Sequence, residues 1–217
     1  MTGRTSGSAD RSRVLVATRS AHKLRELREL LGLRAELIDL DDAGILDEAT
    51  EDGATFEANA AKKARFFALR SGLPTLADDS GLEVDALGGG PGVRTRRYAG
   101  ENATDEENNV KLLAALDGLE PARRRARYRC VLALALPEEL GPRGGLPIRF
   151  ARGTLEGRIA GAPKGDGGFG YDPIFEPAGE RPGGRTLGLW TAEAKNRISH
   201  RGRAARRMHR CLVDLGF

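Results

Sequence analysis

The sequence predicts an α/β fold, because strand patterns and helix patterns alternate along a chain of 217 residues. Val14–Ala17 is a short apolar run, and leucines follow it at helical spacing at positions 24, 27 and 31. Tyr128–Leu136 is a nearly continuous apolar run, which is typical of a strand at the centre of a sheet. The length predicts one domain, or one domain in two lobes.

Composition excludes several classes of protein. Hydrophobic residues make up 40% of the chain and charged residues 30%, as in soluble globular proteins. No apolar run reaches the roughly 18 residues that a membrane span needs, and no signal peptide is visible, so we expect a cytoplasmic protein. Cys130 and Cys211 are far apart in apolar runs, which favours two buried thiols over a disulfide or a metal pair.

The charge is mildly basic and does not predict a stable nucleic-acid partner. The net charge is +4. Residues 1–13 carry half of this excess, and residues 1–12 have the composition of a disordered tail. We expect the domain itself to span residues 13–217. The bias that remains there is equally compatible with a small polyanionic substrate.

The first apolar run predicts a strand, a polar loop and the start of a helix. The loop is Thr18–Lys23, and the N–H groups and dipole of the helix that follows would attract phosphate. Thr18, Ser20 and Lys23 add hydroxyls and a cation to such a site. An ordinary helix cap at Ser20 explains the same residues equally well.

A second strand is predicted over residues 36–40, followed by an acidic loop over residues 41–54 and a helix that starts near Thr55. Phe56, Ala60, Ala64 and Phe67 form the buried stripe of this helix. Glu51 is a candidate metal ligand, with favourable charge at the helix N-terminus as the alternative.

The stretch Leu76–Gly92 contains two adjacent carboxylates, Asp78 and Asp79, after a short apolar run. Neighbouring residues of a strand point to opposite faces, so only one aspartate faces a given site, and we expect the other to tie down the backbone. A carboxylate at the end of a strand suits a metal or a polarised water, and Ser80 is placed to donate to a ligand oxygen. A plain strand and turn is the alternative.

The second half of the chain continues the alternation. Thr104 and Glu107 form a capping box for a helix that Gly118 ends. Residues 148–155 are predicted to be the antiparallel partner of the strand at 128–136, and residues 157–160 a further short strand.

Two later segments carry candidate recognition residues. In the loop Pro163–Pro173, four glycines surround Phe169, Tyr171 and Asp172. A ring held out by glycines can stack on a nucleobase while a carboxylate reads its N–H edge, so function is favoured over core packing here. Lys195, His200 and Arg201 precede or begin the last helix and suit phosphate or carbonyl oxygens.

Taken together, these segments resemble the inosine triphosphate pyrophosphatase family from about Val14 to about Leu215. The most specific matches are Asp78–Leu82 with Gly88–Gly92, Gly168–Pro173 and Ser199–Arg201. The resemblance implies an elongated mixed β-sheet flanked by helices, with two lobes and an active-site cleft between them, and it implies a homodimer. The implied reaction is Mg2+-dependent hydrolysis of ITP, dITP and XTP to the monophosphate and pyrophosphate, which keeps these nucleotides out of DNA and RNA.

The resemblance also implies roles for single residues. Asp79 matches the general base and, with Glu51, the metal ligands. The residues implied to contact substrate are Thr18, Arg19, Ser20, Ala21, His22, Lys23, Ser80, Phe169, Gly170, Tyr171, Asp172, Lys195, His200 and Arg201. Among them, residues 18–23 match the loop that holds the triphosphate, and residues 169–172 match the loop that binds the base.

The sequence departs from the family pattern at three places. The first loop usually reads Thr-Gly-Asn-x-Gly-Lys, whereas here Ser20 replaces the Asn and His22 replaces a Gly. Ala58 replaces a capping-box glutamate, at a cost of about 1 kcal/mol to the helix. Residues 94–97 read Arg-Thr-Arg-Arg in place of Tyr-Ser-Ala-Arg.

Two other functions are compatible with the residues. The altered first loop motivates a pyrophosphatase of different nucleotide preference, which a substrate panel would distinguish. The arginine-rich last helix motivates a non-enzymatic nucleotide- or RNA-binding protein, which would bind polynucleotides in a salt-sensitive way without releasing pyrophosphate.

Overall fold

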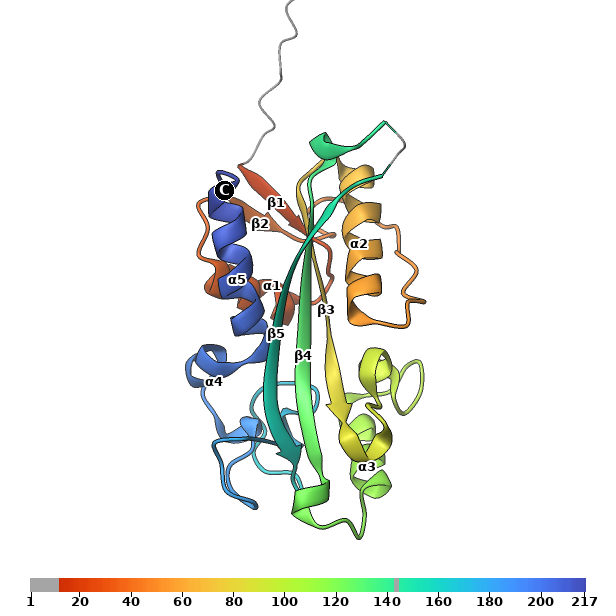
Figure 1. Cartoon of the computed structure of the whole chain (residues 1–217), viewed down its shortest axis with the longest axis vertical. Helices are drawn as coiled ribbons and strands as arrows, with labels where there is room; N and C mark the ends of the chain where they lie inside the picture. Colours follow the sequence, from red (N-terminus) through yellow and green to blue (C-terminus); the bar gives the residue numbers. More distant parts are fainter. Residues whose placement is uncertain (1–11, 143–144) are drawn as a thin grey trace, which may run out of the picture.

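A mixed sheet of six strands is the centre of the computed structural model, which describes residues 12–142 and 145–217 (Figure 1). The strand order is β2-β1-β3-β4-β5-β6. The strands are β1 (Arg13–Val16), β2 (Glu36–Ile38), β3 (Thr75–Val84), β4 (Arg125–Ala135), β5 (Ile148–Ile159) and β6 (Phe175–Pro177). The α-helices are α1 (Ala21–Leu31), α2 (Phe56–Ser71), α3 (Asp105–Ala115), α4 (Ala192–Ile198) and α5 (His200–Asp214). Short segments of 3-10 helix are η1 (Asp85–Leu87), η2 (Gly92–Arg97), η3 (Pro121–Arg123), η4 (Pro137–Glu139), η5 (Asp172–Ile174) and η6 (Leu187–Leu189).

The sheet is elongated because its three middle strands are long. β1 is parallel to both of its neighbours, β2 and β3, whereas β3, β4, β5 and β6 pair antiparallel. β3 and β4 stay in register from Thr75 opposite Ala135 to Val84 opposite Ala126. Figure 1 shows α1, α2 and α5 at one end of these strands and α3 at the other. This arrangement confirms the predicted α/β fold with an elongated mixed sheet.

Alternation along β4 supplies both faces of the sheet with core residues. Leu132 and Leu134 lie in one buried cluster with Met208 of α5 and with the leucines of α1. Val131 and Ala133, one residue out of phase, lie in a second cluster with the buried face of α2. Because neighbouring side chains of a strand point to opposite faces, α1 and α5 cover one face and α2 covers the other.

The far end of the sheet has its own core. Leu82 and Val84 of β3 lie in a third buried cluster with Tyr128 of β4, Phe175 of β6 and Leu112 of α3. The long strands therefore connect two groups of packed elements, one on either side of the middle of β3. The predicted capping box of α3 is present, with Thr104 and Glu107 bonding each other's backbone N–H.

Two sequence expectations need correction, and a third, the disordered tail, falls largely outside the described residues. Residues 148–160 form one strand to Ile159 instead of two, because β4 pairs with β5 as far as Arg125 opposite Arg158. The aspartate pair lies in the middle of β3 and not at a strand end. The predicted tail lies outside the described residues except for Ser12, whose carbonyl accepts a hydrogen bond from the N–H of Glu36 at 2.7 Å.

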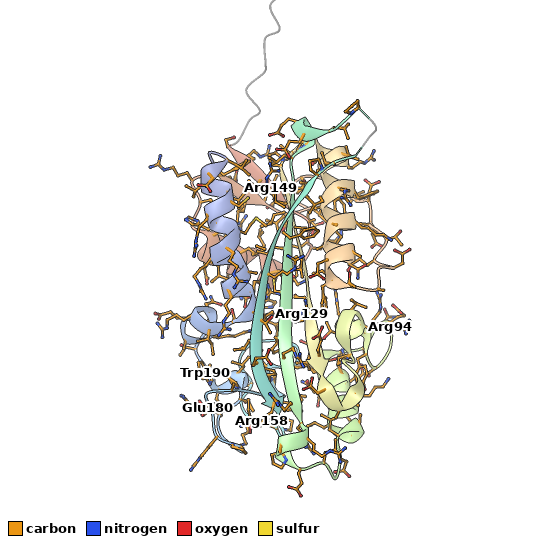
Figure 2. All side chains as sticks on the ribbon, in the orientation of Figure 1. Arg94, Arg129, Arg149, Arg158, Glu180 and Trp190 are labelled. Carbon is orange, nitrogen blue, oxygen red and sulfur yellow. The ribbon has the colours of Figure 1, made fainter. Side chains whose placement is uncertain are left out.

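Surface charges on the sheet pair with one another. Arg129 of β4, near the centre of Figure 2, bonds Glu83 at 3.2 Å and lies 3.6 Å from Glu57. Arg94, in the segment that departs from the family pattern, is exposed at the side of the molecule in the same figure.

Within residues 12–142 and 145–217, no helix has both the length and the apolarity to cross a membrane.

Candidate active site

The two aspartates of β3 point to opposite faces of the sheet, as the alternation predicts. Asp78 lies opposite Leu132 of β4 and faces α1 and α5, whereas Asp79 lies opposite Val131 and faces α2. Both side chains are almost fully buried. The sheet therefore presents one carboxylate to each side, and each carboxylate has its own set of charged neighbours.

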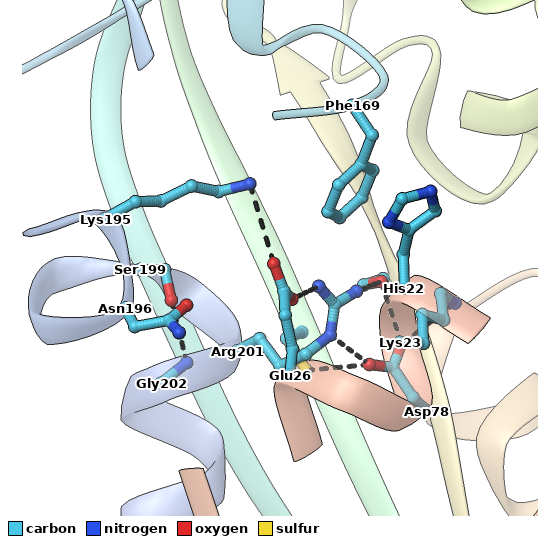
Figure 3. A network of polar contacts seen from close by, with 12 residues as sticks. His22, Lys23, Glu26, Asp78, Phe169, Lys195, Asn196, Ser199, Arg201 and Gly202 are labelled. Carbon is cyan, nitrogen blue, oxygen red and sulfur yellow. Dashed lines mark hydrogen bonds and ion pairs between the residues drawn. The ribbon is translucent and has the colours of Figure 1, made fainter. Parts of the chain in front are cut away.

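Asp78 is held by cations. The Arg201 Nε donates to one carboxylate oxygen at 2.6 Å, and the Lys23 Nζ donates to the other at 3.2 Å (Figure 3). The Ser80 hydroxyl donates to Asp78 at 2.8 Å and accepts from Arg201 at 3.0 Å. Burial by itself raises the pKa of Asp78, but Arg201, Lys23 and these hydrogen bonds outweigh it and hold the pKa well below the usual range. The expectation that the aspartate facing away from the catalytic side ties down the backbone is wrong, since that aspartate is Asp78 and it binds side chains.

Asp79 has a different environment, centred on the buried ammonium of Lys63. The Lys63 Nζ donates to the backbone carbonyl of Asp78 at 2.9 Å and lies 3.4 Å from Asp79 and 3.2 Å from Glu51. Burial raises the pKa of Asp79 to about 6, and the charge of Glu51 adds to the rise while Lys63 opposes it. Burial lowers the pKa of Lys63, but Asp79 and Glu51 overcome this and leave it raised.

Sequence reasoning missed Lys63 as a site residue, although it identified the face of α2 that carries it. The only signal was the spacing of Asn59 and Lys63, four residues apart on the same side of the helix. Asn59 accepts a hydrogen bond from the Gly53 N–H at 2.7 Å, just after Glu51. The Arg97 guanidinium also donates to the carbonyl of Glu51, at 3.4 Å. α2 and Arg97 thus position the acidic loop against β3.

The carboxylates near Lys63 fit a small divalent cation. One oxygen of Asp79, Oδ2, is buried without a hydrogen-bond partner among the described residues. Two carboxylates already converge on one cation there, so the site favours positive charge. No group of three or more metal-ligating side chains occurs in the described part of the chain. A pair of carboxylates is compatible with Mg2+, which commonly uses one or two carboxylates and completes its shell with waters and substrate phosphates.

The first loop uses several of its polar groups locally. The Ser20 hydroxyl accepts from the Lys23 N–H, and the Thr18 hydroxyl accepts from the Ser20 N–H at 3.1 Å. The predicted helix cap at Ser20 is therefore confirmed. Ala21 is exposed as the first residue of α1. Arg19 turns to the acidic loop, where it donates to the carbonyl of Ile45 at 2.9 Å.

The glycine-rich loop is fixed by a buried carboxylate. Asp172 accepts from the backbone N–H of Phe169 at 2.9 Å and from Lys195 at 2.6 Å. Burial raises the pKa of Asp172 against the opposing charge of Lys195. The Gly170 N–H donates to Asp105 at 2.6 Å, which ties this loop to the start of α3.

The two rings of this loop have different roles. Phe169 is half-buried, with the Lys195 Nζ 4.3 Å and the Arg201 guanidinium carbon 5.6 Å from its ring centre. Tyr171 is buried in the core of the far end, and its hydroxyl donates to the carbonyl of Thr95 at 2.7 Å. The expectation that glycines hold both rings out is wrong for Tyr171, because its neighbours in the third cluster provide an apolar site for it.

Glu26 of α1 connects the cations of the recognition residues. It bonds Arg201, and its carboxylate lies 3.7 Å from the Lys195 Nζ (Figure 3). The sequence offered no signal for Glu26, since it is one of several charged residues on a short amphipathic helix. Its position shows that α1 contributes to both the loop and the recognition residues.

His200 is buried and carries no charge. Its ring stacks on Tyr128, with centroids 4.7 Å apart and planes at 6°, and its Nδ1 has no hydrogen-bond partner within the described ranges. Burial and the neighbouring charge of Arg201 hold its pKa well below the usual range. His200 is therefore a neutral ring beside the cations Lys195 and Arg201.

Three arginines of α5 donate hydrogen bonds to backbone carbonyls of the protein. Arg203 and Arg207 donate to the carbonyls of Thr154 and Arg152 on β5 at 2.9 and 2.6 Å, and Arg206 donates to that of Arg197 at 3.0 Å. These three arginines therefore have partners within the protein.

Comparison with known proteins gives a consistent result. A sequence profile of the Ham1 family matches residues 14–211. A dITP/XTP pyrophosphatase of Geobacter sulfurreducens is 50% identical over 194 residues, 89% of this chain and 92% of the relative. That of Syntrophobacter fumaroxidans is 48% identical over 198 residues, 91% and 80% of the two chains. The solved structure of a HAM1 protein from Coxiella burnetii superposes with a TM-score of 0.81 at 40% identity, covering 93% of this chain and 98% of that one.

Proposed function

The chain belongs to the Ham1 family, and from this we propose that it hydrolyses deaminated purine nucleoside triphosphates to the monophosphate and pyrophosphate. The relatives named dITP/XTP pyrophosphatase cover nearly the whole chain at 43–50% identity. The observation that carries the proposal is the opposed pair on β3, with a carboxylate of raised pKa on one side and cations beside an aromatic ring on the other.

We assign Asp79 as the general base. A carboxylate whose pKa is about 6 is largely ionised at neutral pH and still basic enough to accept a proton from water. The Lys63 ammonium bonds both Asp79 and Glu51 and so holds the two carboxylates in place. Phosphoryl transfer depends mainly on positioning and on charge neutralisation, so the ammonium groups of Lys63 and Lys23 would stabilise negative charge on phosphate oxygens.

We propose that Glu51 and Asp79 hold Mg2+ together with the phosphates of the substrate. The unpartnered Oδ2 of Asp79 and the excess of carboxylate over ammonium at Lys63 support this assignment. The metal would neutralise phosphate charge and polarise the attacking water. The protein groups around it fix both carboxylates, since Arg97 and Asn59 hold the loop of Glu51 and β3 holds Asp79.

Recognition of the base is assigned to Phe169 and the groups beside it. The ring would stack on a purine, and Lys195 and Arg201 would donate to the 6-oxo group of hypoxanthine or xanthine. Adenine carries an amino group at that position, so it would leave a donor facing a donor, which costs about 1–3 kcal/mol. Lys23 and the N–H groups at the start of α1 would hold the phosphates.

We further propose a homodimer, on the family resemblance alone. The measurement is the molar mass in solution by light scattering. A mass of two chains is the expected result, and a mass of one chain at micromolar concentration would contradict it.

The test of function is pyrophosphate release with Mg2+ from ITP, XTP, dATP, dGTP and dTTP at equal concentration. Fast release from ITP and XTP, with loss of release in EDTA, is the expected result. Broad release would contradict the 6-oxo selectivity while retaining the chemistry. No release from folded protein would contradict the proposed function.

A further inference from the structure

His22 and Phe169 are two aromatic rings that face each other from separate parts of the chain. Their centroids are 6.1 Å apart and their planes differ by 23°. His22 lies in the first turn of α1, and Phe169 lies in the glycine-rich loop that precedes η5. Figure 3 shows both rings above Arg201, Glu26 and Asp78, with the Lys195 side chain to the left of Phe169.

The separation of the rings is close to that of a two-sided clamp. A planar ring placed between two others needs about 7 Å between the outer rings, twice the contact distance of about 3.5 Å between stacked carbons. The observed 6.1 Å between the centroids is about 1 Å short of this separation. Near-parallel planes are also the arrangement that such an intercalated ring needs.

The two walls differ in how firmly they are held. The backbone N–H of Phe169 is bonded to buried Asp172, so this ring has a fixed base. His22 is exposed, and its Nδ1 is 2.9 Å from the Arg25 guanidinium, one helical turn away. Because a guanidinium can only donate, the Nδ1 of His22 is the acceptor in this contact. His22 is thus the more exposed of the two walls, and its contact with Arg25 orients the ring.

We propose that His22 is the second wall of a clamp for the purine ring, with Phe169 as the first. The inference rests on the proposed function and changes the role of this position, which the family resemblance places in the triphosphate loop. Within that loop, Lys23 faces Asp78, whereas the ring of His22 faces Phe169. His22 therefore contacts the base of the nucleotide, and Lys23 contacts its phosphates.

The experiment compares binding of IMP with binding of inorganic triphosphate, by calorimetry in the same Mg2+ buffer. The variants are His22→Ala, which removes the ring, and His22→Phe, which restores an aromatic wall. We expect His22→Ala to weaken IMP binding roughly 5- to 150-fold, the range of a lost base–aromatic stack, and to leave triphosphate binding within twofold. His22→Phe should recover most of the IMP affinity.

Thermal denaturation of both variants verifies folding, and the exposure of His22 predicts midpoints close to that of the wild type. IMP binding by His22→Ala within twofold of the wild type would overturn the clamp, as would an equal loss for triphosphate. A wild-type protein that binds no IMP overturns it as well. Because binding requires no turnover, the clamp can fail while ITP hydrolysis stands, and the reverse result is equally distinguishable.

Discussion

Asp78 and Asp79 are adjacent in sequence and have opposite electrostatic roles. Asp78 lies among Arg201, Lys23 and Ser80, so its charge is stabilised and its pKa falls. Asp79 shares one ammonium with Glu51, and burial raises its pKa to about 6. A strand places consecutive residues in different environments, which allows one carboxylate to hold the recognition residues while the next one stays available for chemistry.

Asp79→Asn is expected to lower the rate of pyrophosphate release at least 100-fold. The same substitution is expected to stabilise the metal-free protein. The change in pKa from its ordinary 3.8 to about 6 corresponds to about 3 kcal/mol of stability. The wild type has this stability below about pH 4, where Asp79 is protonated, and loses it as the pH rises to about 6 and Asp79 ionises. The advantage of the variant should therefore grow between pH 4 and 6 and then level off.

Chemical denaturation in EDTA across this pH range measures the effect. A variant less stable than the wild type at pH 8 would contradict the assigned cost of the buried charge. Substantial Mg2+-dependent turnover by folded Asp79→Asn would contradict its role as the base.

Lys63→Met is expected to destabilise the protein by about 3 kcal/mol at pH 8, since it leaves the buried carboxylate of Asp79 without its cation. The loss should shrink at pH 5, where Asp79 is mostly protonated, and Mg2+ should restore part of it by replacing the missing charge.

Lys62→Met is the matched control, because Lys62 is the neighbouring lysine and its ion pair with Asp52 is exposed. We expect a change below about 1 kcal/mol for it. Equal destabilisation of the two variants, by denaturant titration, would show that Lys63 has no special role at the site.

At the scale of elements, the start of α5 reaches the site because Gly153 of β5, which has no side chain, lies against its first turn. A Cβ at Gly153 would lie 2.0 Å from the carbonyl oxygen of His200 and 2.7 Å from the N of Ala204. The helix therefore packs directly on the strand backbone. This contact sets the depth at which His200 and Arg201 enter the site.

Gly153→Ala is expected to cost about 1–3 kcal/mol, the range for overpacking a core, and to weaken IMP binding because the first turn of α5 must move. Gly161→Ala is the control, since nothing lies within 4 Å of a Cβ there. Denaturant titration and calorimetry measure both quantities. Unchanged IMP affinity in Gly153→Ala would show that the helix start tolerates displacement.

At the scale of the molecule, the site draws on both groups of elements that the long strands connect. Lys23, Glu51 and Lys63 come from the α1 and α2 end, and Phe169 and Asp172 belong to the end with α3. β3 and β4 span both groups without a break. A ligand that touches both should therefore stabilise the whole molecule.

The described domain is expected to unfold in one transition, and IMP at 100 times its dissociation constant should add about 2.7 kcal/mol to its stability. Thermal denaturation followed by both circular dichroism and tryptophan fluorescence checks this, as Trp190 lies near the third core cluster. Two transitions, only one of them shifted by IMP, would contradict the prediction of a single domain.

The sequence by itself determined the fold class, most of the elements and the side chains that bear the chemistry. Periodicity identified the strands of the middle of the sheet and the buried stripe of α2, and the residue type at Ser20 offered the helix cap as one of two alternatives, because these features depend on neighbours within a few residues. The motif resemblance named the family that the profile match then showed.

Only the tertiary structure decided which of these groups meet. Lys63 joins Glu51 to Asp79, Glu26 joins Arg201 to Lys195, and Tyr171 enters the core while Phe169 stays at the site. Such pairings link residues up to 175 positions apart, and local pattern carries no information about them. They arise because a buried charge must find its partner wherever packing brings one within reach, and packing is a property of the whole chain.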